Sequence, residues 1–384
     1  MKFLQTVIRE NGIRAIVSAE KAIGSHSGTK QPKKLIGKGR IPVMDSKVER
    51  IMEDESAVWI AKFDDDGQIS EDDFVILAMT DLHFEDDPEL RDKTIDMMIR
   101  NISDVNPDLV VFTGDIILSN HQQLDGVRFA KLFEDMGVYW TFIFGNHEAR
   151  AEKEYHKYFL MKNMSQYEHC LAKFGPSELF GYGNHIINIM NRGGSIRQSL
   201  FLFDSGRNIS DKYRFENGLD SDLRGYDYLK NNQKNWYRNH IEEQRRVYGD
   251  FKSLMFMHIP LCEYENVNRL DKFGEYVPTG KAKILYGSQY ESIGCSPVNS
   301  GMFSLIKELG STQAVFAGHD HVNDFCAEYD GVKLVYVQTS GYETYTMGDL
   351  RKWDESKWMQ GATVITVKQD GSIELKQRFN RDYL

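Results

Sequence analysis

Short runs of apolar residues alternate along the chain with segments whose apolar positions have helical spacing. The runs at 109–113 and 140–144 predict short buried strands. After Pro88, the residues Ile95, Met98 and Ile102 recur every three or four positions, which predicts a helix that begins near the proline. Because strands and amphipathic helices alternate in this way, we expect an α/β fold built in layers.

Further elements follow from the same patterns. We expect strands at 200–204, 254–257, 314–317 and 334–338, and helices at 124–136, 152–173 and 231–248. Two hairpins are predicted. In the first, strands at 57–63 and 74–80 flank the acidic turn that contains Asp66-Gly67. In the second, strands at 363–367 and 373–376 flank Asp370-Gly371.

The domain organisation is predicted from changes in composition. Residues 24–40 are basic and nearly free of large apolar side chains, so we interpret residues 1–56 as a partly flexible N-terminal extension. One domain is expected over residues 57–384. Within it, residues 205–228 and 263–299 lack clear periodicity, and we interpret residues 263–299 as a possible lid over a site.

Composition narrows the class of protein. With 384 residues, of which 41% are hydrophobic, the chain can bury a large core. Its 57 acidic and 47 basic residues argue against a general nucleic-acid-binding surface. The four cysteines lack the close pairing of a zinc ribbon and are interpreted as reduced thiols. No signal peptide or membrane-spanning segment is evident, so we expect a cytoplasmic protein without a membrane partner.

Five polar blocks each follow an apolar run and carry most of the chemical information. They supply four histidines, two aspartates and one asparagine as potential metal ligands: Asp81, His83, Asp115, Asn146, His258, His319 and His321. The block Gly-Asn-His-Glu adds His147 as a candidate general acid. Nitrogen and oxygen ligands without a thiolate suit borderline divalent metals, and two metals bridged by a carboxylate suit attack on a phosphate ester.

The positions of the blocks allow them to meet in space. Each block stands at the carboxyl end of a predicted strand, and ligands in layered α/β folds bind outside those ends. Gly114, Gly145 and Gly318 directly precede ligands, and we expect them to permit tight or left-handed turns. A single block is weak evidence, since a histidine after an apolar run such as His258 is often a core residue. All five blocks in order favour a binuclear site.

The blocks resemble those of the calcineurin-like metallophosphoesterase superfamily, with its pattern D-x-H, G-D, G-N-H-[DE], H and G-H-x-H. The resemblance covers roughly residues 73–340. It implies a layered β-sandwich flanked by helices, with a binuclear metal site at the carboxyl ends of the strands. It also implies that one metal binds to Asp81, His83 and His321, that the second binds to Asn146, His258 and His319, and that Asp115 bridges them.

The implied reaction is hydrolysis of a phosphoester by a hydroxide that the two metals share, with His147 as the acid that protonates the leaving group. GHDHVNDF and SPVNSG are similar to a branch related to purple acid phosphatases. That family has a tyrosine ligand at the position of Leu118 and D-x-G at the position of His83, so no ferric–tyrosinate centre is expected. Manganese, iron or zinc are the expected metals.

The substrate and the activity leave alternatives open. Arg269, Lys272, Lys281 and Lys283 favour a phosphomonoesterase if they face the site, and are otherwise surface charges. A phosphodiesterase of the same fold is the nearest alternative, and a non-catalytic metal-binding scaffold is an alternative of another class. We also considered five further residues for the site or its surroundings: Arg150, Asp204, Asp320, Asp324 and Tyr342.

Overall fold

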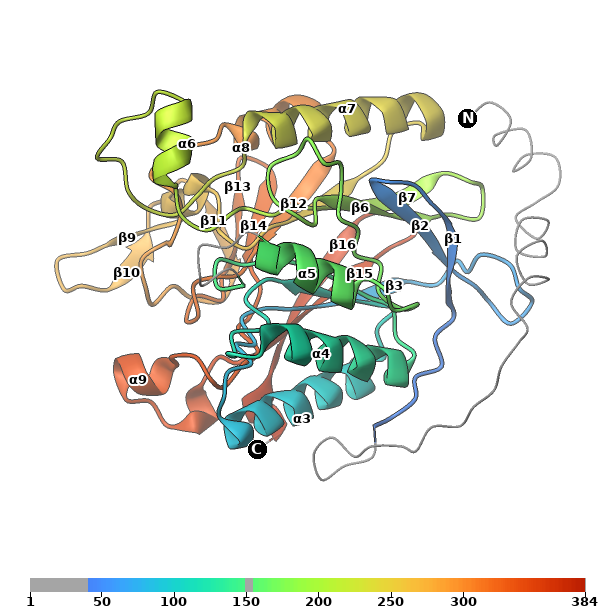
Figure 1. Ribbon diagram of the computed structural model, residues 1–384, viewed down its shortest axis with the longest axis horizontal. Helices are drawn as coiled ribbons and strands as arrows, with labels where there is room; N and C mark the ends of the chain where they lie inside the picture. The colour runs from blue at the N-terminus through green and yellow to red at the C-terminus, as the bar shows by residue number, and fades with distance from the viewer. Residues whose placement is uncertain (1–40, 149–154, 384) are drawn as a thin grey trace.

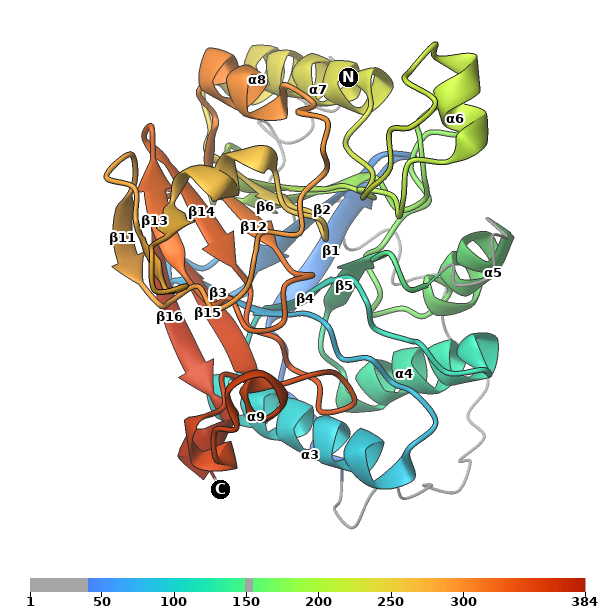
Figure 2. The same ribbon diagram turned by 90° about the vertical axis from the view of Figure 1, so that its left-hand side faces the viewer.

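The computed structural model describes residues 41–148 and 155–383. In this part of the chain, two β-sheets lie face to face and helices cover their outer faces, so that the layers run helix, sheet, sheet, helix (Figure 1). This architecture confirms the layered α/β sandwich that was expected from the sequence. Figure 2 shows the same layers from the side, with α7 and α8 on one face and α3 and α4 on the other.

The larger sheet has nine strands in the order β1-β2-β6-β7-β8-β12-β14-β13-β11. Their bounds are Val48–Glu53, Ala57–Lys62, His185–Met190, Ile196–Leu202, Ser253–Phe256, Thr312–Ala317, Val332–Tyr336, Cys326–Tyr329 and Lys283–Tyr286. Strands β7, β8, β12 and β14 are parallel to one another. Their carboxyl ends therefore lie along one edge.

The smaller sheet has five strands in the order β16-β15-β3-β4-β5. Their bounds are Ile373–Phe379, Gly361–Val367, Phe74–Met79, Leu109–Thr113 and Trp140–Ile143. Strands β3, β4 and β5 are parallel, whereas β15 and β16 form the terminal antiparallel hairpin predicted around Asp370-Gly371. A separate two-stranded ribbon joins β9 (Asn268–Leu270) to β10 (Tyr276–Pro278).

The outer helices bury one face each against the sheets. Helices α3 (Pro88–Val105), α4 (Gln122–Met136) and α5 (Tyr155–Met164) lie beside the five-stranded sheet, and α7 (Asn231–Tyr248) and α8 (Met302–Leu309) lie beside the nine-stranded sheet. Helix α3 begins at Pro88 as predicted, where the Asp87 carboxylate accepts the backbone N–H groups of Glu89 and Leu90. Two short helices, α6 (Asp211–Glu216) and α9 (Met347–Arg351), complete the helical elements of the described residues, with 3₁₀ turns at Cys262–Asn266, Glu355–Lys357 and Asn380–Tyr383.

The continuous apolar runs are explained by burial on both faces of each strand. In β3, Leu77 and Met79 pack with the helices, whereas Ile76 and Ala78 pack between the sheets. In β8, side chains alternate between the two faces in the same way, and Phe256 packs in the core between the sheets. Successive side chains of a strand point to opposite faces, so a strand covered on both sides needs apolar residues at every position.

The first predicted hairpin is wrong, because β2 and β3 belong to different sheets. A tight turn does form, with Gly67 at a φ of 70° and its N–H bonded to the Asp64 carbonyl at 3.0 Å. The chain then crosses to the other sheet. Strand β3 is buried on both faces, and that requires a central position between β15 and β4.

Two of the domain expectations can be compared with the described residues. Strand β1 lies within the predicted extension but pairs with β2 in the nine-stranded sheet, while residues 1–40 lie outside the described part. Residues 263–299 contain most of a 3₁₀ turn, β9, β10 and β11, of which β11 joins the sheet. Among the described residues, no helix is long and apolar enough to cross a membrane.

Candidate metal centre

The seven candidate ligands stand just beyond the carboxyl ends of five strands. Asp81 and His83 follow β3, Asp115 follows β4 and Asn146 follows β5; from the other sheet, His258 follows β8, and His319 and His321 follow β12. Backbone hydrogen bonds hold the loops together, including His83 N–H to the Asp115 carbonyl at 3.0 Å. The structure thus brings all five polar blocks together where the two sheets meet.

The backbone is left-handed at four of these ligands. Their φ angles are 50° at Asp81, 48° at His83, 50° at Asp115 and 79° at His319. Non-glycine residues avoid this region, at a cost of about 1–2 kcal/mol each. Such strain persists where the surrounding structure dictates it, and it concentrates at functional sites.

Gly114 has the expected left-handed backbone, whereas Gly145 and Gly318 have a different role. Only Gly114 has a left-handed φ, at 101°. Gly145 and Gly318 are needed because neighbouring atoms lie too close for a side chain: a Cβ would lie 2.1 Å from Asp115 Oδ1 at Gly145, and 2.2 Å from Thr80 Oγ1 at Gly318. The ligands themselves make most of the tight turns, while these two glycines leave room for them.

The ligand atoms fall into two groups. Asp81, His83 and His321 form one group, and Asp115, His258 and His319 form the other, with the candidate ligand atoms of each group lying within 4.8 Å of one another. Asn146 extends the second group, since its Oδ1 lies 2.9 Å from His258 Nε2.

Asp115 faces both groups. Its Oδ2 lies 3.2 Å from His258 Nε2 in one group and 3.6 Å from His83 Nε2 in the other. Its Oδ1 accepts the backbone N–H of His147 at 2.8 Å, which fixes the carboxylate plane. Asp115 is therefore placed to bridge two cations.

Three buried polar atoms at the centre have no hydrogen-bond partner in the structure: Asp81 Oδ1, Asp115 Oδ2 and His83 Nε2. Leaving a buried polar atom unsatisfied costs about 1–3 kcal/mol. Two of the three are carboxylate oxygens, which accept but do not donate. These orphaned atoms fit two cations, because a cation satisfies converging lone pairs that no donor reaches.

The electrostatics of the centre favour bound positive charge. Burial opposes ionisation of Asp81, yet the nearby imidazoles of His321 and His83, with Nε2 atoms 3.4 and 3.6 Å from Asp81 Oδ1, hold its pKa well below the usual value. Burial likewise disfavours the charged form of His258, yet the Asp115 carboxylate raises the pKa of His258 to about 10. The carboxylates thus attract a positive charge, which a proton or a metal ion provides.

Contacts behind the imidazoles orient two of them. His258 Nδ1 lies 2.9 Å from the Thr113 carbonyl, and His321 Nδ1 contacts the hydroxyl of Thr344. A donated Nδ1–H leaves the lone pair on Nε2, which faces the carboxylates. Both rings therefore present the nitrogen that a metal requires.

His147 is the most exposed histidine of the centre. Its side chain is 35% exposed, whereas His83, His258 and His321 are at most 7% exposed. Its Nε2 lies 3.8 Å from Asp115 Oδ2. This placement at the rim suits a side chain that meets substrate.

Glu148 is a structural residue of the site whose role the sequence pattern does not reveal. Its buried carboxyl group accepts backbone N–H groups of Gly145 at 2.7 Å, Asp115 at 3.2 Å and Ile117 at 3.3 Å, and also that of Ile116. Burial, followed by the charge of Asp115, raises its pKa to about 7. Glu148 ties together the loops after β4 and β5. Its position directly after His147 was the one feature of the sequence that could have indicated this role.

Two tyrosines also contact candidate ligands without any signal in the sequence. The Tyr226 ring meets His319 edge-on with centroids 4.3 Å apart, and the Tyr345 ring stacks on His321 at 4.3 Å. They restrict the orientation of imidazoles from the two ligand groups.

Asp320 and Asp324 hold turns. The Asp320 carboxyl accepts the Gly294 N–H at 3.1 and 3.0 Å and the Tyr336 hydroxyl. Asp324 accepts the Ser288 N–H at 2.8 Å. Both side chains anchor the segment that contains residues 288–294 and so stabilise its turns.

The other candidates are engaged elsewhere or not described. Asp204 pairs with buried Lys157 at 3.0 Å, and Tyr342 packs against the ammonium of Lys93 at 4.1 Å. Arg150 lies outside the described residues.

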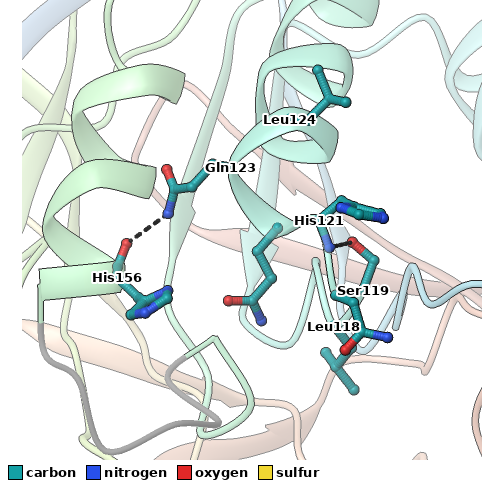
Figure 3. A pocket seen from close by; sticks show the side chains of 8 residues that line it. Leu118, Ser119, His121, Gln123, Leu124 and His156 are labelled. Atoms are coloured by element: carbon teal, nitrogen blue, oxygen red, sulfur yellow. Dashed lines mark hydrogen bonds between the residues drawn. The ribbon is translucent and has the colours of Figure 1, made fainter.

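A cavity of about 360 Å³ lies next to the loop after Asp115, and its lining starts with Leu118, three positions further along the chain (Figure 3). Gln122 connects it to His147, because its Nε2 donates to the His147 carbonyl at 3.4 Å. No Lys, Arg, Asp or Glu is among the described residues that line it: Leu118, Ser119, Asn120, His121, Gln122, Gln123, Leu124 and His156. The lining combines amide and hydroxyl side chains with two leucines and two histidines.

Comparisons with known proteins agree with this geometry. A sequence model of the calcineurin-like phosphoesterase family matches residues 74–323, more than half of the chain. The chain is 29% identical over 320 residues to "Probable inactive purple acid phosphatase 14" of Arabidopsis thaliana, covering 74% of this chain and 73% of that protein. It is 28% identical over 253 residues to "Phosphatase DCR2" of Saccharomyces cerevisiae, covering 62% and 40% respectively.

A solved structure shares the fold. The crystal structure of a dimetal phosphatase from Danio rerio superimposes with a TM-score of 0.50 at 14% identity, over 80% of this chain and 96% of that one.

Proposed function

Because the chain belongs to the calcineurin-like phosphoesterase family, we propose that it is a metal-dependent phosphomonoesterase. The observation that carries this proposal is the pair of ligand groups that share Asp115, with three buried, unpartnered polar atoms between them. Asp81, His83 and His321 would hold one divalent ion, and Asn146, His258 and His319 the other. Manganese, iron and zinc suit these donors.

Two bound divalent ions supply Lewis acidity, lower the pKa of coordinated water and oppose the negative charge that develops on phosphoryl oxygens. The chain itself positions the acid. The backbone N–H of His147 donates to Asp115 Oδ1 at 2.8 Å, which holds the backbone of His147 beside the bridging carboxylate. From the rim, His147 donates a proton to the oxygen of the departing alcohol, a contribution of about 10²–10⁴-fold.

None of the described residues that line the cavity is a Lys, Arg, Asp or Glu, which supports an alcohol group without a charge. The names of the yeast and zebrafish proteins support a phosphatase over a diesterase. Two of the four cations that the sequence suggested for phosphate binding do not add support: Lys281 bonds to Asn266, and Lys272 lies over the ring of Phe273. A phosphorylated small molecule is the proposed substrate.

A non-catalytic metal-binding scaffold is the second candidate, because the names of several plant relatives contain "inactive". Against it stands the complete set of seven ligands with His147 at the rim. A cytoplasmic location stays a prediction, which cell fractionation would test.

The test is hydrolysis of p-nitrophenyl phosphate and of bis-p-nitrophenyl phosphate. The full chain would be stripped with chelator and reconstituted separately with manganese, zinc and ferrous iron. His147→Ala is the test variant, and His169→Ala is the control, since His169 bonds to Glu134 away from the ligands.

We expect metal-dependent turnover of the monoester that falls about 10²–10⁴-fold in His147→Ala with unchanged metal content. Faster turnover of the diester would show a phosphodiesterase. Two bound ions without turnover of either ester would favour the scaffold, and absence of bound metal would overturn the proposal.

A further inference from the structure

Two cysteines from separate segments lie against each other beside the second ligand group. The Cys262 thiol donates to the Ser296 carbonyl at 3.3 Å, which places it beside the neighbouring residue Cys295. The Cys295 thiol is the main cause of a lowered pKa at Cys262. Both side chains are partly exposed, whereas Cys170 and Cys326 are buried. All four are free thiols in the structure.

Each of the two cysteines is close to a ligand of the same group. Cys262 follows His258 by four positions and begins the 3₁₀ turn Cys262–Asn266. Cys295 directly follows Gly294, where an added Cβ would lie 2.7 Å from His319 Cδ2. The segment with Cys295 therefore rests on the imidazole of His319.

We propose that Cys262 and Cys295 are a modification site at which a hydroperoxide converts the two thiols into a disulfide. The bond joins the segment after His258 to the segment that packs on His319. A disulfide holds its sulfurs about 2.05 Å apart, closer than two free thiols in van der Waals contact, so its formation draws the two segments together.

The reaction balances with the hydroperoxide as the oxidant. The neighbouring Cys295 thiol lowers the pKa of Cys262, so Cys262 is the thiol that we assign as the attacking thiolate. Its sulfur takes the terminal oxygen of hydrogen peroxide, the O–O bond breaks and hydroxide leaves, which gives a sulfenic acid. The sulfur of Cys295 then attacks this sulfenic acid, the S–O bond breaks, and water leaves with the thiol proton. Two thiols lose two electrons in total, and peroxide becomes water.

The consequence for the metal centre follows from packing. A shift of the segment next to Gly294 moves its contact with His319, and we expect the second ligand group to hold its cation less tightly. Formation of the disulfide does not depend on the proposed hydrolase function, whereas an effect on hydrolysis does.

The first experiment maps the bond in the full chain. Protein reduced with dithiothreitol and freed of it would be treated with hydrogen peroxide, denatured, alkylated and digested for mass spectrometry without reduction. We expect a linked pair of peptides that contain Cys262 and Cys295, cleaved again by dithiothreitol, with Cys170 and Cys326 alkylated. In Cys295→Ser, dimedone should label Cys262 instead. Cys170→Ser is the matched control and should form the link.

Free Cys262 and Cys295 after peroxide has been consumed by the protein, or a link between other cysteines, would overturn the proposal.

The second experiment compares bound zinc in oxidised and reduced protein. Loss of zinc on oxidation in the native chain, but not in Cys295→Ser, supports the coupling to the metal centre. A disulfide with unchanged zinc content overturns that coupling. A disulfide in protein without turnover in either redox state would refute the hydrolase and leave the modification site standing.

Discussion

We expect the buried residue His185 to lower the free energy of unfolding in mild acid. This buried residue of β6 bonds through Nε2 to the Thr141 hydroxyl of β5 at 2.7 Å and through Nδ1 to the Gly183 carbonyl at 2.7 Å. The contact with Thr141 joins the two sheets. Burial lowers the pKa of His185 to about 4, so the folded protein keeps the ring neutral where an unfolded chain protonates it.

The magnitude follows from the difference between the two states. An unfolded histidine has a pKa of about 6.5 and one pKa unit corresponds to about 1.36 kcal/mol, so the full effect is about 3 kcal/mol. The sign is fixed by proton binding. Between pH 6.5 and pH 4 the unfolded state binds more protons, and stability falls as the pH falls. From pH 7 to pH 5 the loss due to His185 is about 2 kcal/mol.

The assay is urea unfolding followed by tryptophan fluorescence, with chelator present so that metal binding does not contribute. His185→Gln removes the titrating group and should lose about 2 kcal/mol less than the native chain between pH 7 and pH 5. His121→Gln, at an exposed histidine, is the control and should behave as the native chain does. Equal losses in the native chain and in His185→Gln would refute the argument that burial keeps this ring neutral.

Three further predictions concern the centre and its support. Gly145→Ala should abolish metal binding while circular dichroism stays native, because the new Cβ would lie 2.1 Å from Asp115 Oδ1; native metal content in this variant would contradict the steric argument. Thr344→Val should weaken metal affinity about 10–100-fold in a chelator competition, because it removes the hydroxyl that contacts His321 Nδ1, whereas Thr344→Ser should retain it. Trp140→Ala should cost about 3–5 kcal/mol in urea unfolding, because the ring is fully buried among Phe112, Phe129 and Phe133. Trp140→Phe should cost far less, since it also removes an indole N–H that has no partner.

The layered fold was predictable wherever local pattern and tertiary position agree. Helix α3 illustrates this agreement, because Pro88 starts it and its apolar spacing faces the sheet. The turn at Asp66-Gly67 shows the limit. The turn itself formed, but whether β2 and β3 pair depends on the other strands that compete for β3, and local sequence carries no information on that competition.

The candidate ligands were predictable because metal chemistry restricts residue type and because strand ends bring distant blocks together. The residues that hold these ligands in place could not be predicted from the sequence. Glu148 stabilises the centre through backbone N–H groups, and a backbone group can be bonded by any suitably placed acceptor. Tyr226 and Tyr345 contact their imidazoles only through the tertiary fold, so no spacing reveals them.

Because the candidate ligands come from both sheets, bound metal ions would also link the two sheets mechanically. Asp81 and Asp115 belong to loops of the five-stranded sheet, whereas His258 and His319 belong to loops of the nine-stranded sheet. Ions bound by both sets would cross-link the two sheets, since the sheets could not separate without releasing the ions. Ions that bind the folded state alone stabilise it by mass action. The concentration of available metal would then set the stability of the folded protein as well as its rate of catalysis.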